Sequence, residues 1–312
     1  MPWWGLVLII IGGLLLIIII YISYMIFKFA THPLASPRTD LTKVKRFKSF
    51  EDKVQMSYSF YQSLLKEEVT IKSHDNLTLH AEIISKQNAK GTIIMLHGYQ
   101  SSAFVDFTVM IKHCYEMGYN LVLPAQRGCG ISEGKYITFG IKERFDLRDW
   151  INYANGLFGD DLPIILYGVS MGASTVIMST ELGLPKNVKM LVCDCGFDKP
   201  WHICQNVLVS TRHLPTFPFL YLSDFFGIVF AHFSLHKTSP VKALKTNQLP
   251  ILYFHGRLDA FVPIQMGLNN YEHTKSPKEI CIMDEAIHVT CMLKEEKRYQ
   301  KTFDQFIEKY GK

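Results

Sequence analysis

The pattern of apolar and polar positions divides the chain into a uniformly apolar N-terminal stretch and a longer alternation of short apolar runs with amphipathic segments. Residues 3–27 carry no charged side chain and are mostly Ile and Leu. About 20 such residues span the hydrocarbon core of a bilayer as a helix, so this segment is long enough to cross with some tilt. Trp3, Trp4, Tyr21 and Tyr24 bracket the run, as interfacial anchors do.

A cleaved signal peptide fits this segment less well than a membrane anchor does. The apolar stretch is too long, no basic region precedes it, and no clear small-x-small cleavage site follows it. A buried core helix is also disfavoured, because nothing else in the chain is suited to cover a segment that is apolar all round. We therefore expect a single-pass cell-membrane protein that contacts the lipid bilayer through residues 3–27.

The charges that follow the apolar run predict its orientation. Between Lys28 and Phe50 there are six basic residues and one acidic residue, Asp40, whereas the N-terminal flank has none. The positive-inside rule then places the rest of the chain on the cytoplasmic face. Seven cysteines, an odd number without a C-x-x-C pair, exclude a complete disulfide framework and agree with a reducing compartment.

From residue 66 onward, short apolar runs alternate with amphipathic segments of helical period. The first two predicted strands form a hairpin, and the later ones are separated by helices, which predicts a mostly parallel, doubly wound α/β sheet. Strands are predicted over 68–72, 77–84, 92–96, 120–124, 164–168, 189–193, 251–254 and 278–283. Helices are predicted over 43–63, 105–117, 142–154, 173–182 and 294–310.

The pentad Gly168-Val169-Ser170-Met171-Gly172 lies between a predicted strand and a predicted helix. This context is typical of a nucleophile elbow, in which a serine sits on a strained turn and its flanking glycines approach each other too closely for a Cβ. The N-terminus of the following helix faces the point where an oxyanion would develop. An ordinary turn serine is the alternative, and the strand-to-helix context disfavours it.

A nucleophilic serine needs a base, and the base needs an orienting acid. Asp259 follows the strand at 251–254, and His288 follows the strand at 278–283. Because open α/β sheets gather their chemistry at the carboxyl ends of the strands, the predicted triad is Ser170, Asp259 and His288. Asp194, at the end of the strand at 189–193, is the alternative acid.

From about Glu67 to its C-terminus the chain resembles the α/β-hydrolase-fold serine hydrolases, especially bacterial, membrane-anchored members of the serine-aminopeptidase-like and Bem46-like type. The resemblance lies in Leu-His-Gly-Tyr at 96–99, Gln-Arg-Gly-Cys-Gly at 126–130, the elbow, and His-Gly-x-x-Asp-x-x-Val-Pro at 255–263. It implies an oxyanion hole formed by the backbone N–H groups of Tyr99 and Met171. It favours Asp259 over Asp194, because the motif around Asp259 is intact.

The resemblance also implies a division of the chain into parts. We expect an anchor over 1–29, a juxtamembrane linker and helix over 30–65, and a catalytic domain over 66–312. An insertion at about 196–249, rich in aromatic residues, is expected to form a lid over the serine. Such a lid favours an apolar or lipid-like acyl group, although the aromatics are equally suited simply to pack the lid onto the sheet.

The expected activity is hydrolysis of a small-molecule or lipid-like ester through an acyl-enzyme, with no cofactor, metal or nucleic-acid partner. A peptidase or amidase is an alternative, for which Asp198, Asp224 or Asp284 is a candidate to bind a free amine. A non-catalytic, membrane-tethered binding protein is the alternative of another class. The net charge of +5 is spread along the chain, and no G-x-G-x-x-G or Walker pattern occurs.

Five other polar residues are predicted to have structural roles. His97 and His255 precede glycines in the two His-Gly turns and are expected to form structural hydrogen bonds. Arg127 is expected to brace its loop by pairing with an acid. His232 and His236 are one helical turn apart, but without an H-E-x-x-H pattern they favour a place in the lid over a metal site.

Overall fold

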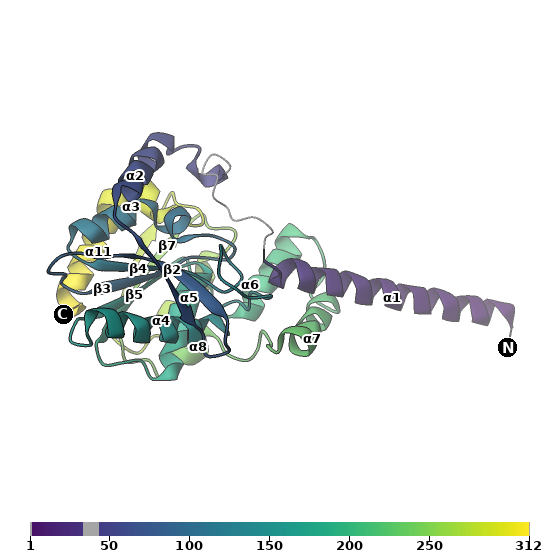
Figure 1. Cartoon of the computed structure of the whole chain (residues 1–312). Coiled ribbons are helices and arrows are strands. Elements are labelled where there is room, and N and C mark those ends of the chain that lie inside the picture. Colours follow the sequence, from purple (N-terminus) through teal and green to yellow (C-terminus); the bar gives the residue numbers. More distant parts are fainter. Residues whose placement is uncertain (1, 34–43, 312) are drawn as a thin grey trace.

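The fold is built on one sheet of eight strands, seen in a computed structural model that describes residues 2–33 and 44–311 (Figure 1). The strand order is β1-β2-β4-β3-β5-β6-β7-β8. The pairs β1–β2 and β2–β4 are antiparallel and the other pairs are parallel. The strands are β1 (Glu67–Lys72), β2 (Thr78–Ile84), β3 (Thr92–Leu96), β4 (Asn120–Ala125), β5 (Ile164–Val169), β6 (Val188–Asp194), β7 (Ile251–Gly256) and β8 (Lys278–Met283). The mostly parallel sheet confirms the predicted fold class, and each strand begins and ends within two residues of its prediction.

Each predicted helix is present with ends within four residues of the prediction, except near the linker, and α6 to α10 had no predicted range. They are α1 (Trp3–Thr31), α2 (Glu51–Ser63), α3 (Ala103–Glu116), α4 (Glu143–Phe158), α5 (Met171–Ser179), α6 (Pro200–Asn206), α7 (Phe219–Ala231), α8 (Pro240–Ala243), α9 (Ile264–His273), α10 (Cys291–Lys294) and α11 (Glu296–Tyr310). The helix predicted over 43–63 begins only at Glu51, after a short 3₁₀ turn at Lys45–Phe47, and residue 43 lies outside the described residues. Glu51 and Asp52 occupy the first turn of α2, where the helix dipole favours negative charge.

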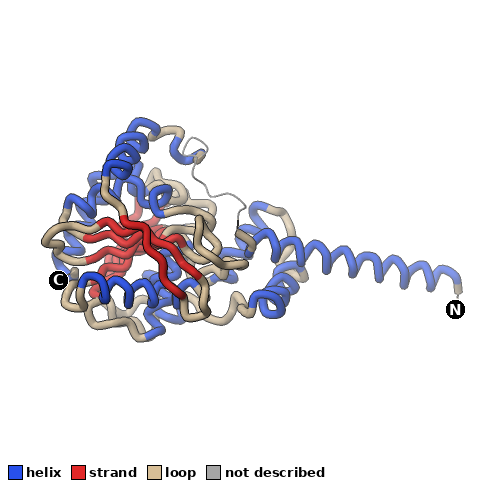
Figure 2. Tube along the Cα trace, viewed as in Figure 1, coloured by secondary structure: helices blue, strands red, loops and turns tan. Residues whose placement is uncertain are grey.

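Helices cover both faces of the sheet, as Figure 2 shows with the strands in red between them. One apolar core lies under α2, α3, α10 and α11 and includes the buried rings of Phe107, Tyr167 and Phe303. The other core lies under α4, α5 and α8 and includes Trp150. Parallel pairing brings the carboxyl ends of β3, β5, β6, β7 and β8 to the same edge, so the loops that follow these strands meet there.

The N-terminal end of helix α1 points away from the sheet and its covering helices, and the last turns of α1 lie against them (Figure 1). Its first two thirds are exposed, whereas Ser23, Phe27 and Thr31 are buried against the rest of the protein. The helix is long and apolar enough to cross a membrane. By length and composition alone, an N-terminal signal sequence meets the same criteria.

The insertion at 196–249 contains α6, a π-helical turn at Val207–Thr211, α7 and α8. Its aromatic residues do not simply pack onto the sheet. Phe226 packs against Tyr24 of α1, with ring centroids 5.5 Å apart, while Phe217 and Phe225 remain 74% and 55% exposed. The insertion therefore uses the N-terminal helix as a packing partner, which the sequence pattern did not predict.

Candidate active site

Ser170 lies at the sharp turn from β5 into α5. Its backbone has φ 54° and ψ −117°, a conformation that costs energy in a residue with a side chain. A Cβ added to Gly168 would lie 2.4 Å from the backbone carbon of Gly172, and one added to Gly172 would lie 1.9 Å from the carbonyl oxygen of Leu96. The close approach that the sequence pattern predicted is present, and only glycine fits at either position.

The structure brings together the three side chains predicted to form a triad. His288 Nε2 lies 3.0 Å from Ser170 Oγ, and His288 Nδ1 lies 2.7 Å from Asp259 Oδ2. The carboxylate can only accept, so Nδ1 carries the proton and Nε2 is free to accept the serine hydroxyl proton. The Asp259 carboxylate is fully buried, whereas the imidazole is 20% exposed.

The carboxylate of Asp259 is held by its own loop. Its Oδ1 accepts the backbone N–H groups of Phe261 and Val262, at 3.0 and 2.8 Å. His255 donates from Nε2 to the Val262 carbonyl at 2.9 Å, which is the structural hydrogen bond predicted for this histidine. Burial lowers the pKa of His255, which keeps its ring neutral beside the triad acid.

Asp194 occupies a different place from the one that a triad acid needs. Its backbone carbonyl accepts the N–H of Ser170 at 2.8 Å, and its Oδ2 accepts the hydroxyl of Tyr299 at 3.0 Å. Burial raises the pKa of this carboxyl to about 6, with the Tyr299 hydrogen bond opposing the shift. His288 forms its carboxylate hydrogen bond with Asp259, which lies on the loop after β7, so the geometry favours Asp259 over Asp194 as the acid.

Cys195, a residue that the sequence analysis did not connect with the site, lies beside Asp259 and His288. Its Sγ and the ligand atoms of Asp259 and His288 all lie within 4.8 Å of one another. Burial raises the pKa of the Cys195 thiol well above its usual value, so the thiol stays protonated at neutral pH. A protonated thiol is a poor metal ligand, and the hydrogen bonds of the other two side chains already account for their placement.

The loop after β3 carries Tyr99 and lies directly against Ser170. A Cβ added to Gly98 would lie 3.1 Å from the Cβ of Ser170. The Gly98 N–H donates to Asp106 Oδ2 at 2.6 Å, and Arg46 donates to Asp106 Oδ1 at 2.6 Å. The sequence analysis did not single out Asp106 or Arg46. An acid in the first turn of a helix that follows a His-Gly loop is, however, a pattern that indicates a residue holding that loop. Together they fix the loop whose next N–H belongs to Tyr99.

The last turn of α1 binds the same loop. The Tyr99 hydroxyl donates to the carbonyl of Ala30 at 3.0 Å, and Gln100 Nε2 donates to the carbonyl of His32 at 3.0 Å. The Thr31 carbonyl accepts the N–H of Ile137 at 2.7 Å. These bonds satisfy carbonyls that a helix C-terminus leaves without intrahelical partners. The N-terminal helix is therefore attached to the loop that adjoins the nucleophile.

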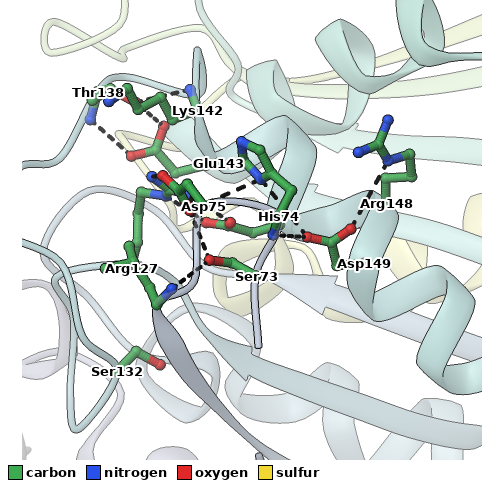
Figure 3. A network of polar contacts seen from close by, with 12 residues as sticks. Ser73, His74, Asp75, Arg127, Ser132, Thr138, Lys142, Glu143, Arg148 and Asp149 are labelled. Atoms are coloured by element: carbon green, nitrogen blue, oxygen red, sulfur yellow. Dashed lines mark hydrogen bonds and ion pairs between the residues drawn. The ribbon is translucent and has the colours of Figure 1, made fainter. Parts of the chain in front are cut away.

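Arg127 braces its loop, as predicted. It donates to both oxygens of Asp146 at 2.6 Å and to both oxygens of Asp75 at 2.8 and 3.0 Å. Figure 3 shows this network, which joins the β1–β2 turn to α4. His74, Asp146 and Asp149 also place ligand atoms near one another. Because Arg127 engages both oxygens of Asp146, the geometry favours an ion-pair network over a metal site.

The remaining predicted histidines lie in structural positions. His97 is fully buried, and its Nε2 accepts the N–H of Gln126 at 3.1 Å. His232 ends α7 with φ 54°, and the ring of His236 stacks on Trp201 at 4.4 Å. His236 therefore packs within the insertion, which agrees with the structural role that the sequence analysis favoured over a metal site.

A groove of about 620 Å³ lies beside the acid loop, between α6 and α9. Asp198 lines it and accepts hydrogen bonds from Asn269 at 2.6 Å and from His202 at 2.9 Å. Asp224 instead accepts the N–H of Leu235, and Asp284 pairs with Arg257 on the surface. Of the three acids considered for amine binding, Asp198 is the one that lines this groove.

Comparisons with known proteins agree with the geometry. Residues 91–241 match the sequence profile of the alpha/beta hydrolase fold. The chain has the alpha/beta hydrolase fold. It is similar to the uncharacterised protein YqkD of Bacillus subtilis, with 23% identity over 80% of this chain and 82% of the relative.

Among solved structures of this fold, an esterase of Pyrococcus furiosus superposes with a TM-score of 0.67 at 23% identity, covering 81% of this chain and 94% of the esterase. An acylaminoacyl peptidase of Pyrococcus horikoshii superposes with a TM-score of 0.63 at 18% identity, covering 83% of this chain and 44% of the peptidase. Esterases and a peptidase are thus both structural neighbours. At these identities the likeness shows the fold alone.

Proposed function

We propose that the protein is a membrane-anchored serine hydrolase that cleaves carboxylic esters through an acyl-enzyme intermediate. The observation that carries this proposal is the continuous hydrogen-bond chain from Ser170 Oγ through His288 to Asp259, with distances of 3.0 and 2.7 Å. Structural serines seldom combine a strained elbow, a neutral imidazole acceptor and a buried orienting carboxylate.

In the proposed mechanism, Ser170 Oγ attacks the ester carbonyl carbon while His288 Nε2 takes the hydroxyl proton. The N–H groups of Tyr99 and Met171 bind the tetrahedral oxyanion, each contributing about 3 kcal/mol to the transition state. The C–O bond then breaks, and His288 returns the proton to the departing alcohol. Water repeats the sequence on the acyl-enzyme, which releases the carboxylic acid and restores Ser170.

We propose that α1 serves as the anchor. Its N-terminal two thirds are exposed and carry no charged side chain, which supports this role. The packing of its last turns against the rest of the chain argues against its removal as a signal sequence. The basic residues after α1 favour the cytoplasmic side for the catalytic body. Protease accessibility of the body in right-side-out and inverted membrane vesicles tests this orientation.

The test of the activity is hydrolysis of p-nitrophenyl esters from acetyl to palmitoyl by the full-length protein in detergent. Ser170→Ala should abolish hydrolysis and labelling by a fluorophosphonate probe, whereas Ser85→Ala, the same change at an exposed serine in the loop after β2, should leave both unchanged. If wild type and Ser170→Ala are equally inert towards every ester and the probe, the proposal is wrong.

A peptidase is the second candidate, favoured by the place of Asp198 in the groove beside the acid loop. An acid with hydrogen-bond donors on one side can hold a substrate ammonium group on the other. Hydrolysis of aminoacyl-p-nitroanilides that is lost in both Asp198→Asn and Ser170→Ala would support this candidate. Hydrolysis that is indifferent to a free N-terminal amine would exclude it.

A further inference from the structure

Helix α7 packs against the base of α1 rather than lying over the sheet (Figure 1). The hydroxyl of Ser223 donates to the carbonyl of Ser23 at 2.9 Å, and this contact is buried. The rings of Tyr24 and Phe27 lie 6.0 and 6.2 Å from the ring of Phe230. Small serines at the crossing allow the two backbones to approach closely, as they do between helices in membranes.

The face of α7 that points away from α1 is apolar and exposed. The 13 residues of α7 include one charged residue, Asp224, whose carboxylate accepts hydrogen bonds from the Leu235 N–H and the Ser234 hydroxyl. The exposed apolar side chains recur at intervals of three and four residues, which puts them on one side of the helix. They are Tyr221, Phe225, Ile228 and Val229, and Phe217 extends the same patch before the helix begins.

The position of this patch along α1 sets its depth. At 1.5 Å per residue, a hydrocarbon core of about 30 Å takes up about 20 residues of helix. Counted from Trp3, these residues end at Ile22, and the hydrogen bond and ring contacts that join α1 to α7 lie just beyond, at Ser23, Tyr24 and Phe27. Helix α7 therefore lies level with the boundary between the hydrocarbon core and the headgroups, on the side of the catalytic body.

Basic side chains surround the same end of α1. Lys28 is exposed on its last turns, and the guanidinium of Arg212 lies 4.4 Å from the ring of Phe29. Lys135 is exposed beside Tyr136, whose ring packs against Phe27 at 5.7 Å. Among the described residues, these three cations form no ion pair with an acid. Unpaired cations at this level suit anionic lipid headgroups.

The nucleophile lies close to this level as well. The hydroxyl of Tyr99 bonds the carbonyl of Ala30, and the preceding residue, Gly98, approaches the Cβ of Ser170. Large exposed apolar patches on a folded chain mark a contact with a membrane or a partner, and here the patch continues the surface of the proposed membrane span. The bilayer is the occupant that accounts for the apolar face, its depth and the cations together.

We propose that α7 lies in the membrane surface with its exposed apolar face among the acyl chains of the leaflet nearest the catalytic body. This inference rests on the proposed anchoring by α1. It extends the contact with the bilayer from one helix to two and sets the serine at the membrane surface. A substrate that reaches Ser170 along α7 is then an amphiphilic ester whose apolar chain starts in that leaflet.

The test measures the depth of α7 in vesicles of phosphatidylcholine and phosphatidylglycerol that contain the full-length protein. Phe225→Cys, made in a Cys204→Ala background because that cysteine is partly exposed, is labelled with an environment-sensitive fluorophore. Lys297→Cys in the same background is the control, because it is exposed on α11, on the side of the body opposite α1 (Figure 1). Hydrolysis of a soluble ester by each labelled protein checks that it remains folded.

The label at position 225 should be quenched by nitroxide-bearing lipids and protected from aqueous iodide, and the label at 297 should behave in the opposite way. If vesicles carry the protein but iodide quenches both labels equally, the inference is overturned while the anchor stands. Failure of the protein to float with vesicles overturns both. Protection at 225 that disappears on dilution of protein in lipid would assign the face to a second copy of the chain and also overturn the inference.

Discussion

Replacement of Asp259 by Asn distinguishes a triad acid from a carboxylate with a structural role. In the wild type, Oδ1 accepts two backbone N–H groups, from Phe261 and Val262, and Oδ2 accepts the Nδ1 proton of His288. An Asn has one oxygen and one NH₂ group for these two sides. If the NH₂ group faced the backbone, two buried donors would lose their acceptor, at a cost of about 1–3 kcal/mol each.

The amide oxygen therefore stays on the backbone side, and the NH₂ group faces His288. It donates to Nδ1, which forces the imidazole proton onto Nε2, 3.0 Å from Ser170 Oγ. In this tautomer Nε2 cannot take the serine proton. The same exchange in a serine protease lowers kcat by about 10⁴, which is a barrier increase of about 5.5 kcal/mol. We expect a loss of this size for Asp259→Asn.

The assay is kcat/KM for p-nitrophenyl butyrate in detergent, with Ser170→Ala as the baseline. Asp194→Asn is the matched control, because it makes the same chemical change at the neighbouring strand end without touching His288. It should retain activity within about tenfold of the wild type, since it alters no hydrogen bond of the imidazole. The reasoning is refuted if Asp194→Asn loses the activity and Asp259→Asn keeps it.

Three further predictions concern the surroundings of the site. Tyr99→Phe keeps the backbone N–H but removes the hydroxyl hydrogen bond to the last turn of α1. The value of kcat should fall about fivefold with KM little changed, as expected for the loss of one hydrogen bond of about 1 kcal/mol. An unchanged kcat would show that α1 does not position the loop. Burial raises the pKa of the Asp194 carboxyl from 3.8 to about 6 in the folded state, so the folded protein binds more protons than the unfolded chain between pH 4 and 6. The free energy of unfolding should therefore fall by about 3 kcal/mol as the pH rises over this range, and Asp194→Asn should remove this slope. Thermal unfolding in detergent measures it, and parallel pH curves for wild type and variant would contradict it. Arg127→Ala should lower the free energy of unfolding by about 3–5 kcal/mol, because it leaves the buried Asp146 carboxylate unpaired. Arg148→Ala, at the partly exposed edge of the network, should lower it by less than about 1 kcal/mol. Equal losses for the two variants would contradict the structural role assigned to Arg127.

The local pattern of the sequence was enough to predict the strands, the sheet class and the elbow. The strand 92–96, four apolar residues after Thr92, is buried along its whole length, as is typical of a parallel strand covered on both faces, so its structure follows from its composition. The demand for glycine at position 168 is also local, because a Cβ there would lie 2.4 Å from the backbone of Gly172, four residues along the chain. The order of the residues along the chain and their places after strand ends were enough to predict that Ser170 and His288 lie close together.

The tertiary structure decided the features that depend on how distant segments meet. Asp194 and Asp259 both follow strands of the parallel sheet, and only the path of the loop after β7 brings one of them to 2.7 Å from His288. The contact of Arg46 with Asp106 joins residues 60 positions apart. The packing of α7 on α1 joins segments about 200 positions apart, as in the bond between Ser223 and Ser23. The spacing of apolar residues along the sequence indicates which face of a segment is apolar. Which other segment packs against that face depends on the packing of the whole chain.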